Sequence, residues 1–328
     1  MCGKIFLDDP AAAVTGISDM QGRTSKRLRS AALAIALLGA VLALAPCRDM
    51  LSVVPVSPAF ESPVRMASPD ATSLFVTDYG IDSVCALDRA TLVPASCFAI
   101  AGKPLGIAAT ADRIFVGNET LHTVEVYDRR GTKISDLPGT FSTPASLAVD
   151  DQTGLLFVLD TASKTITLLT YAGYPVRTIT GDLAGNGKLV NPVALAVDPV
   201  RQEVLVSDYG DVASSFPLYP ARVRIYDYNG TFITVISGST GGFSRPQGLD
   251  VHNDHIFVTD SMVGKVLLFT RLSSTLTATA GALGSFGDGP GQLMLPLDVL
   301  VEPSTGDVLV TNNRPGRIER FEKGGLIP

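Results

Sequence analysis

A short apolar segment that ends in Asp or Asn recurs six times along the chain, and this repeat limits the fold more than any other feature. The segments are rich in β-branched and aromatic residues, which favour strands over helices. They recur at intervals of roughly 40 to 50 residues, a period typical of chains that copy one supersecondary unit. The segments are residues 74–78, 114–118, 156–160, 204–208, 256–260 and 308–312, ending at Asp78, Asn118, Asp160, Asp208, Asp260 and Asn312.

Further strands are predicted at fixed offsets from each Asp or Asn. In five units a β-branched residue follows six positions later, and a large apolar residue three positions after that. The fourth unit keeps this pair as Val223 and Tyr226 but delays it by a nine-residue insertion. A turn such as residues 228–230 then leads to a fourth strand over residues 231–237. Upstream, another strand opens at Pro104, Pro144, Pro192, Pro246 and Pro296.

Four short antiparallel strands per unit predict a β-propeller with six blades, because each blade can bury its apolar faces only against its neighbours. The first unit is the weakest match, since Arg65 falls where the other units place Leu or Val. The sixth unit lacks its outer strand, because the chain stops soon after Phe321. We expect residues 51–56 to supply that strand, which would remove an open edge. The predicted fold is an all-β, six-bladed propeller of four-stranded blades closed by an N-terminal strand.

The N-terminal segment resembles an export signal. The apolar run over residues 30–45 follows Arg23, Lys26, Arg27 and Arg29, and it ends in a small-residue pattern. The run is shorter than the roughly 20 residues that a membrane span needs. Pro46 is a poor context for cleavage, so an uncleaved signal anchor and a lipidated Cys47 remain alternatives, as does a start at Met20 in place of Met1. We therefore expect an exported protein, periplasmic or on the cell surface, with membrane contact only through this segment.

The predicted division of the chain is a signal or anchor over 1–46, a linker with the closing strand over 47–63 and the propeller over 64–328. Within the propeller, a hairpin centred near Thr91 would place Cys85 opposite Cys97. An oxidising compartment favours a disulfide between them over two buried thiols.

Net charge argues against nucleic acid as a partner. Removing the five basic and three acidic residues of 1–45 from the totals of 26 and 32 leaves 21 and 29, a net of −8. An acidic body without a Lys or Arg run repels a phosphate backbone.

Two linkers resemble those of NHL repeats. One is residues 284–293, GSFGDGPGQL, followed by Pro296, and the other is residues 243–251, FSRPQGLDV. The resemblance extends roughly over 64–321 and implies the propeller fold. The NHL family contains RNA binders, protein-binding scaffolds, exported bacterial sensors and a metal-linked peptide lyase, so the resemblance does not select a function.

Candidate metal ligands have structural explanations. The ring of Asp and Asn could hold Ca²⁺ or another divalent cation in the channel, but such residues also cap tight turns by accepting backbone N–H bonds. The pair His252 and His255 has no third ligand at a suitable spacing, and His122 stands alone in another turn. We expect turn caps and surface histidines, and no cofactor.

The motifs of common enzyme classes are absent: the sequence contains no nucleophile elbow, P-loop or dinucleotide fingerprint. The favoured function is a non-enzymatic scaffold that binds a protein or peptide. The alternative is a metal-dependent lactonase or lyase with its site at the channel mouth, built from scattered carboxylates and amides. The sequence does not indicate an oligomeric state.

One propeller face is the predicted binding surface. The turns between second and third strands share that face with the connections between blades. The insertion lies in such a turn and presents Phe216 and Tyr219, and loops longer than the repeat requires often carry function. Tyr79, Tyr209 and Arg314 lie in the same class of turn, and Tyr and Arg are frequent hot-spot residues.

Overall fold

The computed structural model describes residues 53–54, 60–181, 185–211, 220–237, 242–275 and 277–322. Its internal contacts divide the chain into Met1–Pro46 and Cys47–Pro328, and the blades all belong to the second unit. No helix in the described ranges is both long enough and apolar enough to cross a membrane. Almost all regular structure there is β-strand, as predicted.

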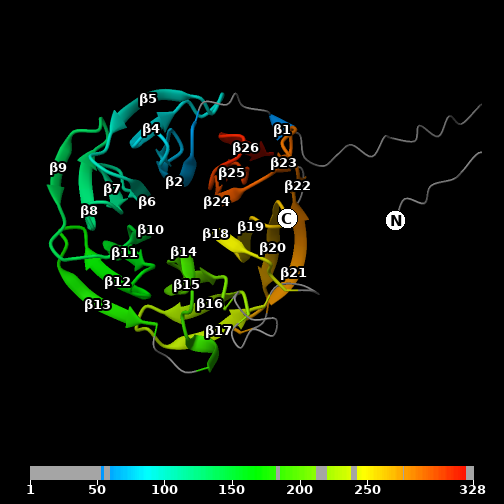
Figure 1. The fold of residues 1–328 in the computed structure, drawn as a ribbon. Helices are drawn as coiled ribbons and strands as arrows, with labels where there is room; N and C mark the ends of the chain where they lie inside the picture. The colour runs from blue at the N-terminus through cyan, green and yellow to red at the C-terminus, as the bar shows by residue number, and fades with distance from the viewer. Residues whose placement is uncertain are drawn as a thin grey trace, which may run out of the picture. The chain divides into compact units, whose positions relative to one another are not determined.

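Six four-stranded antiparallel sheets are arranged around a central channel, with the first strand of each blade innermost (Figure 1). Blade 1 contains β2 (Pro63–Asp70), β3 (Ser73–Asp78), β4 (Ser83–Leu87) and β5 (Pro94–Ala99). Blade 2 contains β6 (Pro104–Ala109), β7 (Arg113–Asn118), β8 (Thr123–Asp128) and β9 (Lys133–Asp136). Blade 3 contains β10 (Pro144–Asp150), β11 (Leu155–Asp160), β12 (Thr165–Thr170) and β13 (Pro175–Thr180).

The remaining blades follow the same order. Blade 4 contains β14 (Pro192–Asp198), β15 (Glu203–Asp208), β16 (Arg222–Asp227) and β17 (Phe232–Ile236). Blade 5 contains β18 (Pro246–His252), β19 (His255–Asp260), β20 (Lys265–Arg271) and β21 (Thr277–Leu283). Blade 6 contains β24 (Pro296–Val301), β25 (Val308–Asn312), β26 (Arg317–Phe321) and β1 (Val53–Val54). The connections hold the 3₁₀ turn η1 (Gly185–Gly187) and the parallel pair β22 (Ser285–Phe286) and β23 (Gln292–Leu293).

The ring closes as predicted, because an N-terminal strand completes the last blade. β1 pairs antiparallel with β26, with Val53 opposite Phe321 and Val54 opposite Arg320. The described part of the predicted segment 51–56 is therefore the fourth strand of blade 6. Pairing the two ends of the propeller in one sheet covers the outer edge of β26.

The second strand of each blade is its most deeply buried strand. All residues after the first are buried in β3, β7, β11, β15, β19 and β25. These strands are covered on both faces, which explains their nearly continuous apolar sequences. Phe115 of blade 2, for example, packs in one cluster with Leu147 and Leu156 of blade 3. The repeated apolar segment is thus the core between neighbouring blades.

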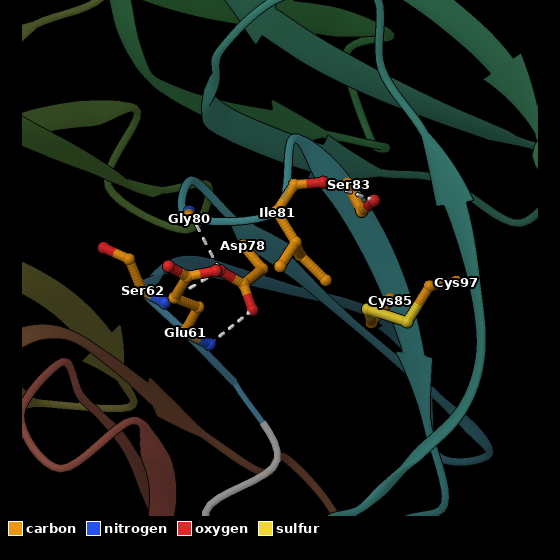
Figure 2. Close-up of a disulfide and its surroundings, with 8 residues drawn as sticks. All are labelled: Glu61, Ser62, Asp78, Gly80, Ile81, Ser83, Cys85 and Cys97. Carbon is orange, nitrogen blue, oxygen red and sulfur yellow. Dashed lines mark hydrogen bonds between the residues drawn. A yellow bond between two sulfur atoms is a disulfide. The ribbon is translucent and has the colours of Figure 1, made fainter.

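The Asp or Asn that ends each second strand caps a turn, as expected from the sequence. Figure 2 shows Asp78 accepting hydrogen bonds from the backbone N–H groups of Glu61, Ser62 and Gly80 at 2.8–3.0 Å. The carboxyl groups of Asp160, Asp208 and Asp260, and the amide oxygen of Asn312, accept equivalent backbone bonds. Asn118 makes this link by donating from Nδ2 to the carbonyl oxygen of Ala101, and its Oδ1 accepts the N–H of Leu121 in the turn. These side chains tie the strand end to the segment before the inner strand of the same blade.

The predicted disulfide is present. Cys85 of β4 lies directly opposite Cys97 of β5, and their sulfur atoms are bonded at 2.02 Å (Figure 2). Cys85 is buried whereas Cys97 is exposed on the outer strand. The bond therefore links a core strand of blade 1 to its edge.

The expected register of blade 1 needs a correction at Arg65. Pro63 pairs with Asp78 and Met66 with Val76, so Met66 occupies the position filled by Ile, Leu or Val in the other blades. Arg65 is equivalent to Gly106, Ser146, Ala194, Gly248 and Asp298. The sequence alignment was wrong by one residue because the spacing from Pro63 to Asp78 lies between the two spacings found elsewhere.

Candidate functional site

The central channel contains two chambers separated by the side chain of Arg65. Arg65 Nη1 donates to the carbonyl oxygen of Leu297 at 2.6 Å and to Asp298 Oδ1 at 3.2 Å, both on blade 6. Its Nη2 donates to the carbonyl oxygen of Val193 on blade 4 at 2.9 Å. The guanidinium group thus joins three blades, and Arg65 lines both chambers. We name the face with the turns between second and third strands the upper face, and the opposite one the lower face.

The upper chamber has a volume of about 410 Å³. Its deeper wall is formed by the residue after the opening Pro of every inner strand. Five of these six residues are apolar and one is an amide: Val64, Leu105, Ala145, Val193, Leu297 and Gln247. Gln247 is 7% exposed, so blade 5 places a buried amide where the repeat otherwise places an aliphatic side chain.

The rim of this chamber is built from two positions per blade on one shared backbone scaffold. The residue after each capping Asp or Asn donates its N–H to the carbonyl oxygen of the residue before the inner strand's Pro, at 2.9–3.2 Å. This bond occurs in all six blades, so the side chains at these two positions differ between blades while the backbone geometry stays the same. The rim residues that line the chamber are Glu119, Thr143, Thr161, Asn191, Tyr209 and Arg245.

Two rim contacts join neighbouring blades. The Tyr79 hydroxyl of blade 1 donates to Glu119 Oε2 of blade 2 at 2.9 Å, and this bond raises the pKa of Tyr79 above its usual value. Lys103 lies over the Tyr79 ring and forms an ion pair with Asp82 at 2.6 Å. Between blades 4 and 5, the Arg245 guanidinium lies 5.6 Å from the centre of the Tyr209 ring.

The lower chamber, of about 250 Å³, is lined mostly by aliphatic residues but contains two carboxyl groups. Asp298 accepts the N–H of Met66 at 2.9 Å, and Asp250 accepts the N–H of Val301 at 2.7 Å. Each bond joins the inner strands of adjacent blades. Burial raises the pKa of Asp298, against the effect of Arg65, and raises the pKa of Asp250 to about 7. Asp250 faces the chamber and is half-buried, so solvent in the chamber partly solvates its charge.

The structure places the predicted site residues in different settings. Tyr209 lines the upper chamber. Tyr79 is half-buried beside the chamber and forms a hydrogen bond with Glu119 through its hydroxyl. Arg314 is exposed in the turn between β25 and β26, on the same face but outside the chamber lining. Phe216 and Tyr219 lie outside the described residues.

Sequence reasoning missed a group of exposed apolar side chains on the upper face. They are Ile81, Leu121, Met262, Val263 and Phe286, between 37% and 65% exposed. Three of them, Ile81, Leu121 and Val263, occupy the third position after the capping residue, a repeated position that could have indicated them. The backbone of Phe286 lies against Gly264, so Phe286 adjoins the turn that contains Met262 and Val263. We call Met262, Val263 and Phe286 the apolar patch.

The histidines lie in turns or at strand ends, as expected. His122 is exposed and its Nδ1 lies 2.5 Å from the carbonyl oxygen of Ser142, while His255 Nδ1 lies 3.2 Å from Thr270 Oγ1. Within the described ranges, no group of three or more His, Cys, Asp or Glu side chains is arranged to hold a metal ion.

Solved structures with a similar backbone are β-propellers with different activities. Hydrazine synthase of Kuenenia stuttgartiensis is 16% identical, with a TM-score of 0.59 over 82% of this chain and 79% of that chain. A gluconolactonase of Xanthomonas campestris is 13% identical, with a TM-score of 0.59 over 83% and 89%. Streptogramin B lyase is 12% identical, with a TM-score of 0.55 over 83% and 97%. These likenesses show the β-propeller fold. No family model matches the sequence, and no curated protein matches it.

Proposed function

We propose that this protein is an exported, NHL-type propeller that binds a protein or peptide through its upper face. The observation that carries the proposal is the apolar patch of Met262, Val263 and Phe286, together with Ile81 and Leu121 on the same face. Exposed apolar side chains are not needed to form these tight turns, and clusters of them mark interaction surfaces. Tyr209 and Arg314 add residue types that often dominate binding energy.

The sequence insertion belongs to the same proposed surface. Its described ends, Asp211 and Pro220, lie between β15 and β16, in the class of turn that forms the upper face. Phe216 and Tyr219 of the insertion, with Tyr79, Tyr209 and Arg314, complete the set of proposed contact residues. Export is supported by the disulfide, which forms in oxidising compartments. The N-terminal segment is proposed as a cleaved signal, an uncleaved anchor or the site of lipidation at Cys47.

The proposal is tested by capture of partners from the envelope fraction of the native cell. A Met262→Ser, Phe286→Ser variant should lose at least tenfold in the yield of a partner that wild-type protein captures, because the centre of an interface carries most of its affinity. The matched control is Val200→Ser, Leu272→Ser, which removes two apolar side chains of the lower face that are at least 60% exposed. Equal capture by both variants would reject the upper face, and so would failure of wild-type protein to capture any partner.

A second double variant tests the insertion by itself. Phe216→Ala with Tyr219→Ala should weaken binding of the captured partner while the thermal unfolding midpoint stays unchanged. Unchanged affinity in this folded variant would remove the insertion from the proposed contact set.

The alternative function is a metal-dependent lactonase or lyase at the upper chamber. It is favoured by the presence on the rim of a carboxylate, Glu119, and an amide, Asn191, which are oxygen ligands that divalent cations accept. Metal analysis of the purified protein and an assay of lactone hydrolysis test this alternative. Metal-free protein without hydrolytic activity would exclude it.

A further inference from the structure

Gln247 is the one polar residue among the six that form the deeper wall of the upper chamber. The residue is 7% exposed; its backbone carbonyl accepts the Ser207 hydroxyl, whereas its side-chain amide forms no hydrogen bond with the described residues. The side chain faces the chamber, where Leu occupies the equivalent position in blades 2 and 6, so the amide offers hydrogen-bonding groups that the repeat itself does not need. The amide is therefore better explained by a ligand in the chamber than by the fold.

A cationic group stands above Gln247 on the same blade. Arg245 precedes β18 by one residue, lines the chamber and stacks on the Tyr209 ring. Its guanidinium group forms no ion pair with a carboxylate of the described residues. The guanidinium, the Gln247 amide and the Tyr209 hydroxyl are hydrogen-bond donors suited to a carboxylate.

An anionic group lies on the opposite side of the ring. Glu119 belongs to blade 2, and blades 2 and 5 face each other across the channel (Figure 1). Glu119 Oε2 accepts the Tyr79 hydroxyl, which fixes the carboxylate and leaves Oε1 as an acceptor. The nearby Lys103 forms its ion pair with Asp82, so a ligand can still serve as the counter-ion of Glu119.

From these observations we infer that the upper chamber binds a small zwitterion, namely a short peptide with unblocked ends. A ligand with only a carboxylate would be attracted by Arg245 and repelled by Glu119, and a ligand with only an ammonium group would meet the reverse. A zwitterion satisfies both poles when its carboxylate lies at Arg245 and Gln247 and its ammonium group at Glu119. The volume of about 410 Å³ lies within the usual range for small-molecule sites, roughly 300–1,000 Å³.

This site shares Tyr209 with the proposed protein contacts but contains no residue of the apolar patch. The charged poles are Glu119 and Arg245, whereas the patch consists of Met262, Val263 and Phe286. Capture of a protein partner and binding of a zwitterion can therefore succeed or fail independently.

The experiment is isothermal titration of the purified full chain with a panel of dipeptides of varied side chains. Each dipeptide is used in three forms: unblocked, N-acetylated and C-amidated. The proposal predicts that at least one unblocked dipeptide binds and that each blocked form of it binds at least tenfold more weakly, because each loses one charged contact. Equal affinity of the unblocked form and either blocked form would overturn the proposal. Absence of binding by every unblocked dipeptide at about 10 mM would also overturn it.

Three variants assign the poles. Glu119→Gln should abolish the preference for the unblocked form over the N-acetylated form. Arg245→Gln should abolish the preference for the unblocked form over the C-amidated form. Gln247→Leu introduces the residue found at this position in blades 2 and 6. It should weaken the binding of the unblocked dipeptide about tenfold without lowering the thermal unfolding midpoint of the protein. The control is Arg130→Gln, an exposed arginine in the turn between β8 and β9 on the lower face, and it should bind as wild type. Preferences unchanged in both charge variants would overturn the assignment.

Discussion

Arg65 and Val193 are joined across the central channel by a hydrogen bond of 2.9 Å from the guanidinium Nη2 to the carbonyl oxygen. Blades 1 and 4, which carry these residues, are opposite each other in the ring (Figure 1). The same guanidinium holds Asp298 of blade 6 at 3.2 Å. The Arg65 side chain, from the unit that matches the repeat least well, therefore links the first and last blades where they meet.

Replacing Arg65 by Met should lower the free energy of unfolding by about 3 kcal/mol, because the change leaves the buried carboxylate of Asp298 without its cation. Adding Asp298→Asn should recover part of this loss, since Asn can still accept the N–H of Met66. Urea denaturation of both variants measures the difference. A double variant less stable than Arg65→Met alone would show that the ion pair is not the source of the loss.

The six-bladed ring could be predicted because the second strands repeat a nearly continuous apolar segment followed by a capping residue. Each cap and each Pro marks a strand end with a local physical cause, which a single sequence shows. The disulfide was predictable for the same reason, since a short hairpin fixes Cys85 opposite Cys97.

The channel lining could not be predicted from periodicity. The pairing between first and second strands shifts register after the opening Pro, as between Pro246 and Leu249. This shift places both Gln247 and Asp250, three residues apart, in the chamber walls, although simple alternation would put them on opposite faces. The exposed turn residues Ile81 and Val263 were missed because apolar residues beside strands resemble continuations of those strands.

Asp250 should make the stability of the protein depend on pH. Its pKa is raised from 3.8 to about 7 in the folded protein by burial in the channel. The folded state therefore holds this proton more tightly than the unfolded state, and its contribution to stability is complete below about pH 4 and lost as the pH rises through about 7. The effect is smaller than the upper bound of about 4 kcal/mol for three pKa units, because Asp250 is partly solvated.

The Asp250→Asn variant removes this titration. Its free energy of unfolding, measured by denaturant at several pH values, should fall less steeply between pH 4 and 7 than that of wild type. The slope is the readout, since Asn also loses one acceptor for a backbone N–H. Parallel curves for the two proteins would contradict the assignment.

The disulfide should contribute about 3 kcal/mol or less, because it closes a loop with a sequence separation of 12 residues. A Cys85→Ala, Cys97→Ala variant should unfold at lower denaturant concentration than wild type and should not respond to a reductant. Wild-type protein should lose a similar amount of stability when reduced. Two free thiols in protein purified from an oxidising compartment without reductant would disprove the bond.

Removing β1 should expose the edge of β26 and weaken ring closure. A chain that begins at residue 60 loses the pairing of Val53 and Val54 with β26, so its thermal midpoint should fall and it should self-associate through the open edge. A chain that begins at residue 47 retains β1 and is the matched control. Equal midpoints and equal monomer content in size-exclusion chromatography would show that closure does not depend on this strand.

Gly117 should tolerate no side chain, although the equivalent residues of four other blades are Thr or Ser. Thr77 and Thr311 use their hydroxyls to donate to backbone carbonyls of the next blade, at 3.0 and 3.2 Å. At Gly117 the neighbouring blade is closer, and an added Cβ would lie 2.0 Å from the carbonyl oxygen of Pro144.

Because that oxygen belongs to the backbone of an inner strand, it cannot move without shifting blade 3 against blade 2. Gly117→Ser should therefore lower the free energy of unfolding by about 1–3 kcal/mol, the usual cost of overpacking. At the equivalent position of blade 6, Thr311→Ser keeps the hydroxyl donor on a smaller side chain. It should lower the free energy of unfolding by less than about 1 kcal/mol, as expected for a small change at a buried site. Denaturant unfolding compares the two variants. Equal stabilities would mean that blades 2 and 3 are less tightly packed than the distance to Pro144 indicates.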